Sequence, residues 1–151
     1  MKLGIESLGG LYARSALFFC NKNEAERILA LPAGTDIKEL LTKLRALGSE
    51  TVVVTDGPRG AYAYDGTEML KVPMYPDLRP PLERTGAGDA FASTITSALI
   101  LGKPLGEALL WGPVNAMAVV QEIGAQKGLL TREALEKYLA DAPTSYRVEP
   151  L

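Results

Sequence analysis

The sequence predicts an α/β protein, and three observations lead to this prediction. Two apolar runs, "ALFFC" (16–20) and "TVVVT" (51–55), are too short for helices and carry no polar face, as is typical of buried strands in a parallel sheet. An amphipathic helical segment over 36–48 lies between them, and further helical segments fill the second half of the chain. The order strand, helix, strand, hairpin and helices is typical of a layered α/β structure.

The helix over 36–48 has a signal at each end. Its apolar positions form one stripe, which consists of Ile37, Leu40, Leu41, Leu44 and Leu47. Asp36 and Glu39 have the spacing of a capping box at its start, and Gly48 stands where the helix should stop. A shorter helical segment, "EAERILAL", begins at Glu24.

The second half begins with a hairpin and continues with helices. Asp65–Gly66 separates two strand-like runs and predicts the hairpin turn. The segment 73–84 contains four prolines and should be irregular. The nearly uncharged stretch from Pro104 to Gly124 predicts a buried helix that Pro113 breaks or kinks, and a last helix is expected over 131–140. We expect one domain over 1–151, with an N-terminal extension at 1–15 and a tail at 141–151.

The composition excludes several kinds of chemistry. The chain of 151 residues has a net charge of −2, which gives no reason to expect binding to nucleic acid. It contains one cysteine, Cys20, and no histidine, so an intramolecular disulfide, Ser–His or Cys–His catalysis and histidine-ligated metals are excluded. Neither a signal peptide nor a membrane span is recognisable, and we expect a soluble cytoplasmic protein.

The stretch "RTGAGDAF" (84–91) places an acid where glycines open a helix. The first N–H groups of a helix have no intrahelical acceptor, and Gly86, Ala87 and Gly88 would let a phosphate approach them. Asp89 in the first turn either only stabilises the helix end or accepts a proton from an alcohol during phosphoryl transfer. The P-loop pattern and the dinucleotide fingerprint are both absent, since Pro104 follows Gly102–Lys103 and Phe91 stands where the third small residue belongs.

Four stretches in the same order resemble the PfkB (ribokinase-like) carbohydrate kinases. "RTGAGDAF" is similar to the family's D-T-x-G-A-G-D signature, and "NKNE" (21–24) is similar to its N-x-x-E element. "VVVTDGPRGAYAYDG" resembles its nucleotide-binding strand and hairpin, and "IGAQKGLL" (123–130) resembles the segment after its adenine-side helices. The resemblance covers about 16–139. It implies a partial three-layer α/β/α fold and ATP-dependent phosphoryl transfer to a sugar hydroxyl.

The resemblance also implies a role for each matching residue. Asp89 would be the general base, and the backbone of Gly86, Ala87 and Gly88 the anion hole. The nucleotide-side residues would be Asn21, Glu24, Thr55, Asp56, Gly57, Gly60 and Asn115, with Glu24 also helping to place Mg²⁺. A monovalent cation such as K⁺ would bind near Glu83, Thr85 and Gly124, although Glu83 replaces the family's usual Asp. Alternatives stay open: Asn21 and Glu24 could simply cap a helix, Asp56–Gly57 could be only a turn, and Asn115 could be a helix-start residue.

Family members are longer, and this chain resembles only their C-terminal, nucleotide-side half. The acceptor-binding part of the family has no counterpart here, so the sugar cannot be identified from the sequence. Three hypotheses follow: the catalytic half of a sugar kinase, a nucleotide-binding module without turnover, or an inactive fragment that self-associates. The expected partners are a nucleotide, a small sugar, and either a second copy of the chain or a complementary N-terminal half.

Overall fold

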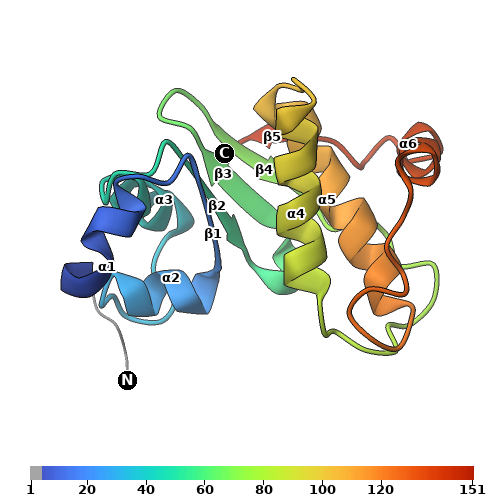
Figure 1. The fold of residues 1–151 in the computed structure, drawn as a ribbon, viewed down its shortest axis with the longest axis horizontal. Helices are drawn as coiled ribbons and strands as arrows, with labels where there is room; N and C mark the ends of the chain where they lie inside the picture. Colours follow the sequence, from blue (N-terminus) through green and yellow to red (C-terminus); the bar gives the residue numbers. More distant parts are fainter. Residues whose placement is uncertain (1–4) are drawn as a thin grey trace. The chain divides into compact units, whose positions relative to one another are not determined.

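The computed structural model describes residues 5–151, which divide into two compact units (Figure 1). Of the described residues, unit 1 contains 5–71 together with Glu149–Leu151, and unit 2 consists of Val72–Val148. The α/β class predicted from the sequence is confirmed, since helices accompany a five-stranded sheet. The prediction of a single domain over 1–151 stays a prediction.

The sheet of unit 1 has the strand order β1-β2-β3-β4-β5. Its strands are β1 (Leu17–Asn21), β2 (Thr51–Thr55), β3 (Ala61–Tyr64), β4 (Met69–Val72) and β5 (Glu149–Pro150). β1 and β2 are the two runs predicted as strands. They pair in parallel, so that Asn21 lies opposite Thr55 at their carboxyl ends.

The second neighbour of β2 runs in the opposite direction. β3 pairs with β2 antiparallel, with Ala63 opposite Val53. The side chains of Val52, Val53 and Val54 are fully buried, as expected for a strand without a polar face. The hairpin prediction at Asp65–Gly66 is confirmed, because β3 and β4 are neighbours joined by residues 65–68, and Gly66 has a positive φ of 98°.

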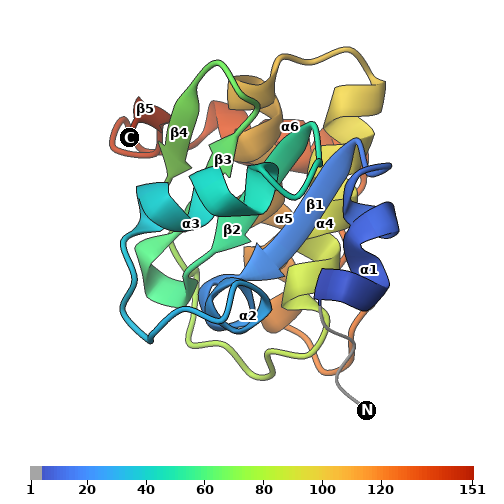
Figure 2. The ribbon, with the colours of Figure 1, turned by 90° about the vertical axis from the view of Figure 1, so that its left-hand side faces the viewer.

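Helices α2 (Lys22–Ile28) and α3 (Ile37–Arg45) form the core of unit 1 with the sheet. α3 lies over β2 and β3 (Figure 2). The buried core side chains are Cys20, Ala25, Leu40, Leu41, Leu44, Val52, Val54 and Tyr62. The stripe predicted for the helix over 36–48 therefore supplies three of the central leucines.

The start of α3 corrects one sequence prediction. Asp36 caps the helix as expected, accepting from the N–H groups of Lys38 at 2.9 Å and Glu39 at 3.3 Å. Among the bonds that the described residues make, however, the reciprocal half of the capping box is missing. The Glu39 carboxylate instead pairs with Lys43 one turn later, at 2.9 Å, which is a favourable spacing for opposite charges on a helix.

The predicted extension and tail are both partly structured. Helix α1 (Ile5–Tyr12) ends at a buried tyrosine, whose ring meets Phe18 edge-on with centroids 5.1 Å apart. The Ser49 hydroxyl donates to the carbonyl of Tyr12 at 3.1 Å. At the other end, Glu149 pairs with Lys71 in the β4–β5 ladder. The end of α1 and the last residues of the chain are therefore built into unit 1.

Unit 2 contains the helices α4 (Ala87–Ile100), α5 (Leu105–Val120) and α6 (Arg132–Ala140). The segment before α4 is irregular, as its prolines predict. α4 and α5 lie side by side (Figure 1), and a Cβ added at Gly112 would come within 2.8 Å of Phe91 and 2.9 Å of Ile95. Gly112 therefore lets the two helices approach closely. No helix in the part of the chain from residue 5 onward is long and apolar enough to cross a membrane.

Of the two outcomes predicted at Pro113, the break does not occur, because α5 runs without interruption from Leu105 to Val120, whereas the kink stays a prediction. A proline inside a helix removes one hydrogen bond and crowds the preceding turn, at a cost of about 3 kcal/mol. Burial offsets this cost, since the neighbouring side chains of Leu109, Trp111, Val114 and Met117 are all at most 5% exposed. Packing thus overrides the local preference of the proline.

Candidate functional site

The N-terminus of α4 is built for close approach of the backbone. Gly86 is the N-cap and has a left-handed conformation, with φ 82° and ψ −6°. A Cβ at this position would lie 2.7 Å from Ala125 Cα and 2.8 Å from the Ala125 carbonyl oxygen. Only glycine readily adopts the left-handed conformation and also has no Cβ to clash with Ala125. Gly86 therefore lets the start of α4 pack against the loop that follows α5.

The first turn of α4 offers free backbone donors. The N–H of Ala87 donates to the carbonyl of Arg84 at 3.3 Å, whereas those of Gly88 and Asp89 have no acceptor within residues 5–151. A Cβ at Gly88 would meet no atom within 4 Å, so this side of the turn is open. Free N–H groups at the positive end of a helix dipole can bind an anion such as phosphate.

The Asp89 side chain projects from the same turn. It is exposed, does not cap the helix, and makes no hydrogen bond or ion pair with any described residue. Its carboxylate is therefore available to a ligand, either as a negative charge at the helix end or as an acceptor for the proton of an alcohol.

The three residues predicted for a monovalent cation lie together beside this turn. The Glu83 carboxylate accepts from the N–H of Gly124 at 2.9 Å. A hydrogen bond from the Thr85 side chain, and then the bond from Gly124, hold the pKa of Glu83 below its usual 4.5. The side chain thus spans the segment before α4 and the loop after α5. Among the described residues no group of three or more His, Cys, Asp or Glu could hold a metal.

The alternative that Asn115 is a helix-start residue is wrong. Asn115 lies in the middle of α5 and is 6% exposed. Its amide nitrogen donates to the Thr94 hydroxyl at 2.7 Å, and its amide oxygen accepts from the N–H of Leu130 at 3.0 Å. Asn115 therefore joins α4, α5 and the segment before α6, which accounts for its burial. A contact with nucleotide stays a prediction.

Asn21 and Glu24 form a complete capping box in unit 1. The Asn21 side chain accepts from the N–H of Glu24 at 2.9 Å, and the Glu24 carboxylate accepts from the N–H of Asn21 at 2.8 Å. The capping role considered for this pair is therefore confirmed. Glu24 remains exposed, so one of its oxygens can still face solvent or a hydrated ion.

The loop at 55–60 begins at the carboxyl end of β2, next to the carboxyl end of β1, because Thr55 lies opposite Asn21. The N–H of Asp56 donates to the carbonyl of Gly60 at 2.8 Å, and both Gly57 and Gly60 have a positive φ. The Asp56 carboxylate accepts two bonds from Arg59, at 2.6 and 2.7 Å. The turn considered for Asp56–Gly57 is present, and the Asp56 carboxylate is already hydrogen-bonded to Arg59.

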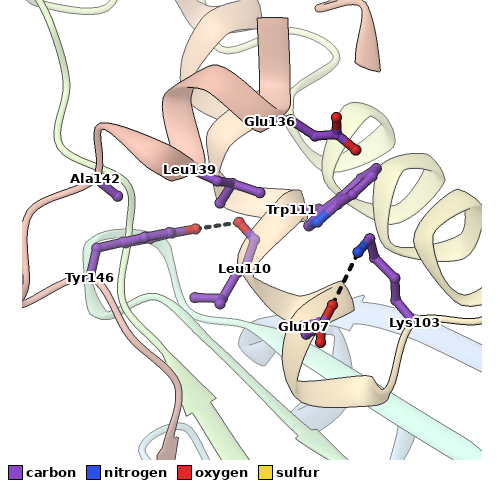
Figure 3. Close-up of a pocket in the computed structure, with 8 residues that line it drawn as sticks. All are labelled: Lys103, Glu107, Leu110, Trp111, Glu136, Leu139, Ala142 and Tyr146. Carbon is purple, nitrogen blue, oxygen red and sulfur yellow. Dashed lines mark hydrogen bonds and ion pairs between the residues drawn. The ribbon is translucent and has the colours of Figure 1, made fainter. Parts of the chain in front are cut away.

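A separate pocket of about 350 Å³ lies between α5, α6 and the segment after α6 (Figure 3). Lys103 lies over the Trp111 ring, 5.2 Å from its centroid, and pairs with Glu107 at 3.0 Å. Glu136, also at the rim, pairs with Arg132 at 2.8 Å. These rim charges already have partners, so the pocket offers a ligand no unpaired charge.

The predicted residues thus form two groups. Unit 1 contains the Asn21–Glu24 capping box and the loop at 55–60, which lie at the carboxyl ends of β1 and β2. Unit 2 contains the start of α4, the Glu83 cluster and Asn115. Sequence reasoning missed Arg79 and Gln121, which hold the segment before α4, because no spacing rule connects residues 42 positions apart.

An open helix N-terminus and glycine-containing loops are features of proteins that bind phosphate groups, and the free carboxylate in the first turn can accept a proton beside such a group. Residues 6–132 match the profile described as pfkB family carbohydrate kinase. This match covers most of the chain, and the protein therefore belongs to the pfkB family of carbohydrate kinases.

Relatives and solved structures agree with this assignment. The chain is 32% identical over 122 residues to a ribokinase of Bacillus subtilis, matching 81% of this chain and 39% of the relative. It is 31% identical over 116 residues to a cytidine kinase of Thermococcus kodakarensis, matching 76% and 40%. The structure of Arabidopsis thaliana ribokinase complexed with ribose and ATP superposes with a TM-score of 0.80 at 26% identity, over 87% of this chain and 43% of that one. The nucleoside kinase of Methanocaldococcus jannaschii, an archaeal member of the ribokinase family, gives 0.78 at 26% identity, over 92% and 44%.

These matches confirm the ribokinase-like fold and the predicted family. The chain spans about two fifths of the length of the curated relatives it matches.

Proposed function

We propose that this chain supplies the nucleotide-binding and catalytic-base part of an ATP-dependent carbohydrate kinase. The observation that supports this most directly is the start of α4, where the unpaired N–H groups of Gly88 and Asp89 adjoin the unpaired Asp89 carboxylate. The B. subtilis relative is a ribokinase, and the superposed Arabidopsis protein is in complex with ribose and ATP. ATP and a sugar hydroxyl are therefore the proposed substrates.

The proposed chemistry divides between backbone and side chain. The free N–H groups of Gly88 and Asp89, in the turn that Gly86, Ala87 and Gly88 form, stabilise negative charge that develops on the transferred phosphoryl group. The Asp89 carboxylate orients the acceptor hydroxyl and takes its proton as the new O–P bond forms and the bond from phosphorus to the leaving ADP oxygen breaks.

The donor set fits Mg²⁺ held mainly through the nucleotide. Mg²⁺ keeps several waters in phosphate sites and uses one or two carboxylates together with substrate phosphates. Glu24 is an exposed carboxylate of that kind. The other proposed nucleotide-side residues of unit 1 lie at or just after the carboxyl ends of β1 and β2; they are Asn21, Thr55, Asp56, Gly57 and Gly60. When bound, the metal neutralises charge on the phosphates. For a monovalent cation such as K⁺, we propose the cluster of Glu83, Thr85 and Gly124.

A second candidate is a nucleotide-binding module without turnover, which acts with a second copy or a complementary N-terminal half. Both candidates require nucleotide binding, and they differ in whether Asp89 performs chemistry.

The substitution Asp89→Asn separates the two candidates. ADP formation from Mg-ATP would be measured with a panel of pentoses, hexoses and nucleosides. We expect turnover with at least one acceptor, and a loss of about 10²- to 10⁴-fold in Asp89→Asn at unchanged ADP affinity. Equal rates in the variant would reduce Asp89 to a helix-end charge, and no turnover with any acceptor would favour the second candidate.

A further inference from the structure

Arg79 and Gln121 hold each other by reciprocal hydrogen bonds, which we call the Arg79–Gln121 clasp. The Arg79 guanidinium donates through Nε to the Gln121 side-chain oxygen at 2.9 Å and through Nη2 to the Gln121 carbonyl at 2.7 Å. In return, the Gln121 amide nitrogen donates to the carbonyl of Arg79 at 2.9 Å. The same Nη2 also pairs with Glu122 at 3.2 Å.

The clasp fixes the segment before α4 to the end of α5. Gln121 is buried, with 6% of its surface exposed, and both polar groups of its side chain bond to Arg79. The N–H of Leu82 donates to the carbonyl of Val120 at 2.8 Å, which extends the contact along the segment. Two-pronged bonds from a guanidinium are among the stronger hydrogen bonds in proteins and fix orientation as well as distance.

The clasped segment leads directly to the start of α4. Glu83 follows it and bonds to Gly124 at 2.9 Å. Gly86 then packs so closely on Ala125 that no Cβ would fit. The turn that carries the free N–H groups is therefore held against the loop after α5 at successive points, of which the clasp is the first.

We propose that Arg79 is a positioning residue for the phosphate-binding turn. The segment at 73–86 has no regular secondary structure, so ordering it costs conformational entropy that its contacts must offset. The clasp offsets this cost before any ligand arrives and keeps the N–H groups of Gly88 and Asp89 aligned. The nature of the ligand rests on the proposed function, whereas the ordering of the turn does not.

The chain offers a matched pair of variants for the test. Arg79→Met removes the clasp and one of the two cations that contact Glu122. Lys127→Met removes the other cation, which pairs with Glu122 at 2.9 Å, but leaves Gln121 untouched. Hydrogen exchange at the bonded N–H groups of Leu82, Glu83, Ala87 and Gly124 would be measured without ligand, alongside the Tm and the affinity for Mg-ADP.

We expect Arg79→Met to speed exchange at these N–H groups and to weaken Mg-ADP binding, each about tenfold, and to lower the Tm, because the buried side-chain oxygen of Gln121 loses its donor. Lys127→Met should resemble the wild type in all three measurements. Arg79→Lys keeps the charge but cannot form two parallel bonds, so it should not restore exchange protection. The double variant Arg79→Met/Gln121→Met should differ little from either single variant, because each substitution breaks the same Arg79–Gln121 interaction.

Each result bears on a separate claim. Unchanged exchange in Arg79→Met, an equal effect of Lys127→Met, or full restoration by Arg79→Lys would overturn the positioning role. If the wild type bound no Mg-ADP, the proposed function would fail, and the exchange data would still decide whether the clasp orders the turn.

Discussion

Asn21 and Glu24 bond to each other in both directions at the start of α2, with distances of 2.9 and 2.8 Å between side chain and backbone. The motif that resembles a family signature is therefore also a helix cap. The same two residues can cap α2 and also take part in ligand binding. A substitution that affects only one of these roles separates them.

Glu24→Gln should separate the cap from the proposed Mg²⁺ role. A glutamine oxygen can still accept the bond from the N–H of Asn21, so urea denaturation should give nearly the wild-type free energy of unfolding. Asn21→Ala, as the comparison, should lose about 1 kcal/mol. We expect Glu24→Gln to weaken the binding of Mg-ADP but not of metal-free ADP. A variant that loses stability and keeps Mg²⁺ dependence would make Glu24 only a cap.

The Glu83 carboxylate should give unit 2 a stability contribution that depends on pH. Hydrogen bonds from Thr85 and then Gly124 lower the pKa of Glu83 in the folded state. A group with a depressed folded pKa stabilises the protein above its unfolded pKa, and that stabilisation is lost as the pH falls through the folded value. We expect the Tm difference between wild type and Glu83→Gln to shrink as the pH falls below about 4.5. A difference that is constant from pH 7 to pH 3 would contradict the bond to Gly124.

The Cys20 thiol should be inert in the folded chain. Burial, together with the nearby charge of Glu24, raises the pKa of Cys20 from the usual 9.0 to about 12. Because the thiolate is the reacting form, this shift lowers its population at pH 8 roughly a thousandfold. Labelling with a thiol reagent should therefore be slow in buffer and rapid in denaturant. Rapid labelling of folded protein would show that β1 is not packed as described.

The open edge of β1 should promote self-association. β1 is the terminal strand in the sheet order of the described chain, and it contains no charged residue to discourage pairing. The net charge of −2 gives little repulsion between copies. We expect sedimentation at micromolar concentration to reveal a dimer, and Ala16→Lys, at an exposed position beside β1, to weaken it. A wild-type chain that sediments purely as a monomer would rule this out.

Local sequence signals predicted the elements that depend on local chemistry. The leucine stripe of α3, the turn at Gly66 and the start of α4 at Gly86 each follow from residue spacing or from a conformation that favours glycine. The break considered at Pro113 does not occur, because packing in a buried helix can offset the cost of a proline, and packing does not depend on neighbours in the sequence alone.

The contacts that organise the candidate site depend on tertiary structure. Arg79 meets Gln121, and Asn115 meets Thr94, only after α4 and α5 are packed. Glu39 could have completed a capping box, yet it pairs with Lys43 instead, and both outcomes fit the same sequence. Spacing rules therefore located the turn for which we propose phosphate binding, but not the residues that hold it.

Titration calorimetry of Mg-ATP and Mg-ADP against the wild type and Gly88→Val tests the central proposal most directly. Gly88 lies in the first turn of α4 with open space where a Cβ would lie, so valine should fold there while its methyl groups block phosphate. Gly10→Val, at an exposed position in α1 with similar open space, is the matched control. We predict a Kd of roughly millimolar or tighter for the wild type and for Gly10→Val, and at least tenfold weaker binding for Gly88→Val. No heat of binding from a folded wild-type chain at millimolar nucleotide, or equal affinity in all three proteins, would contradict the account.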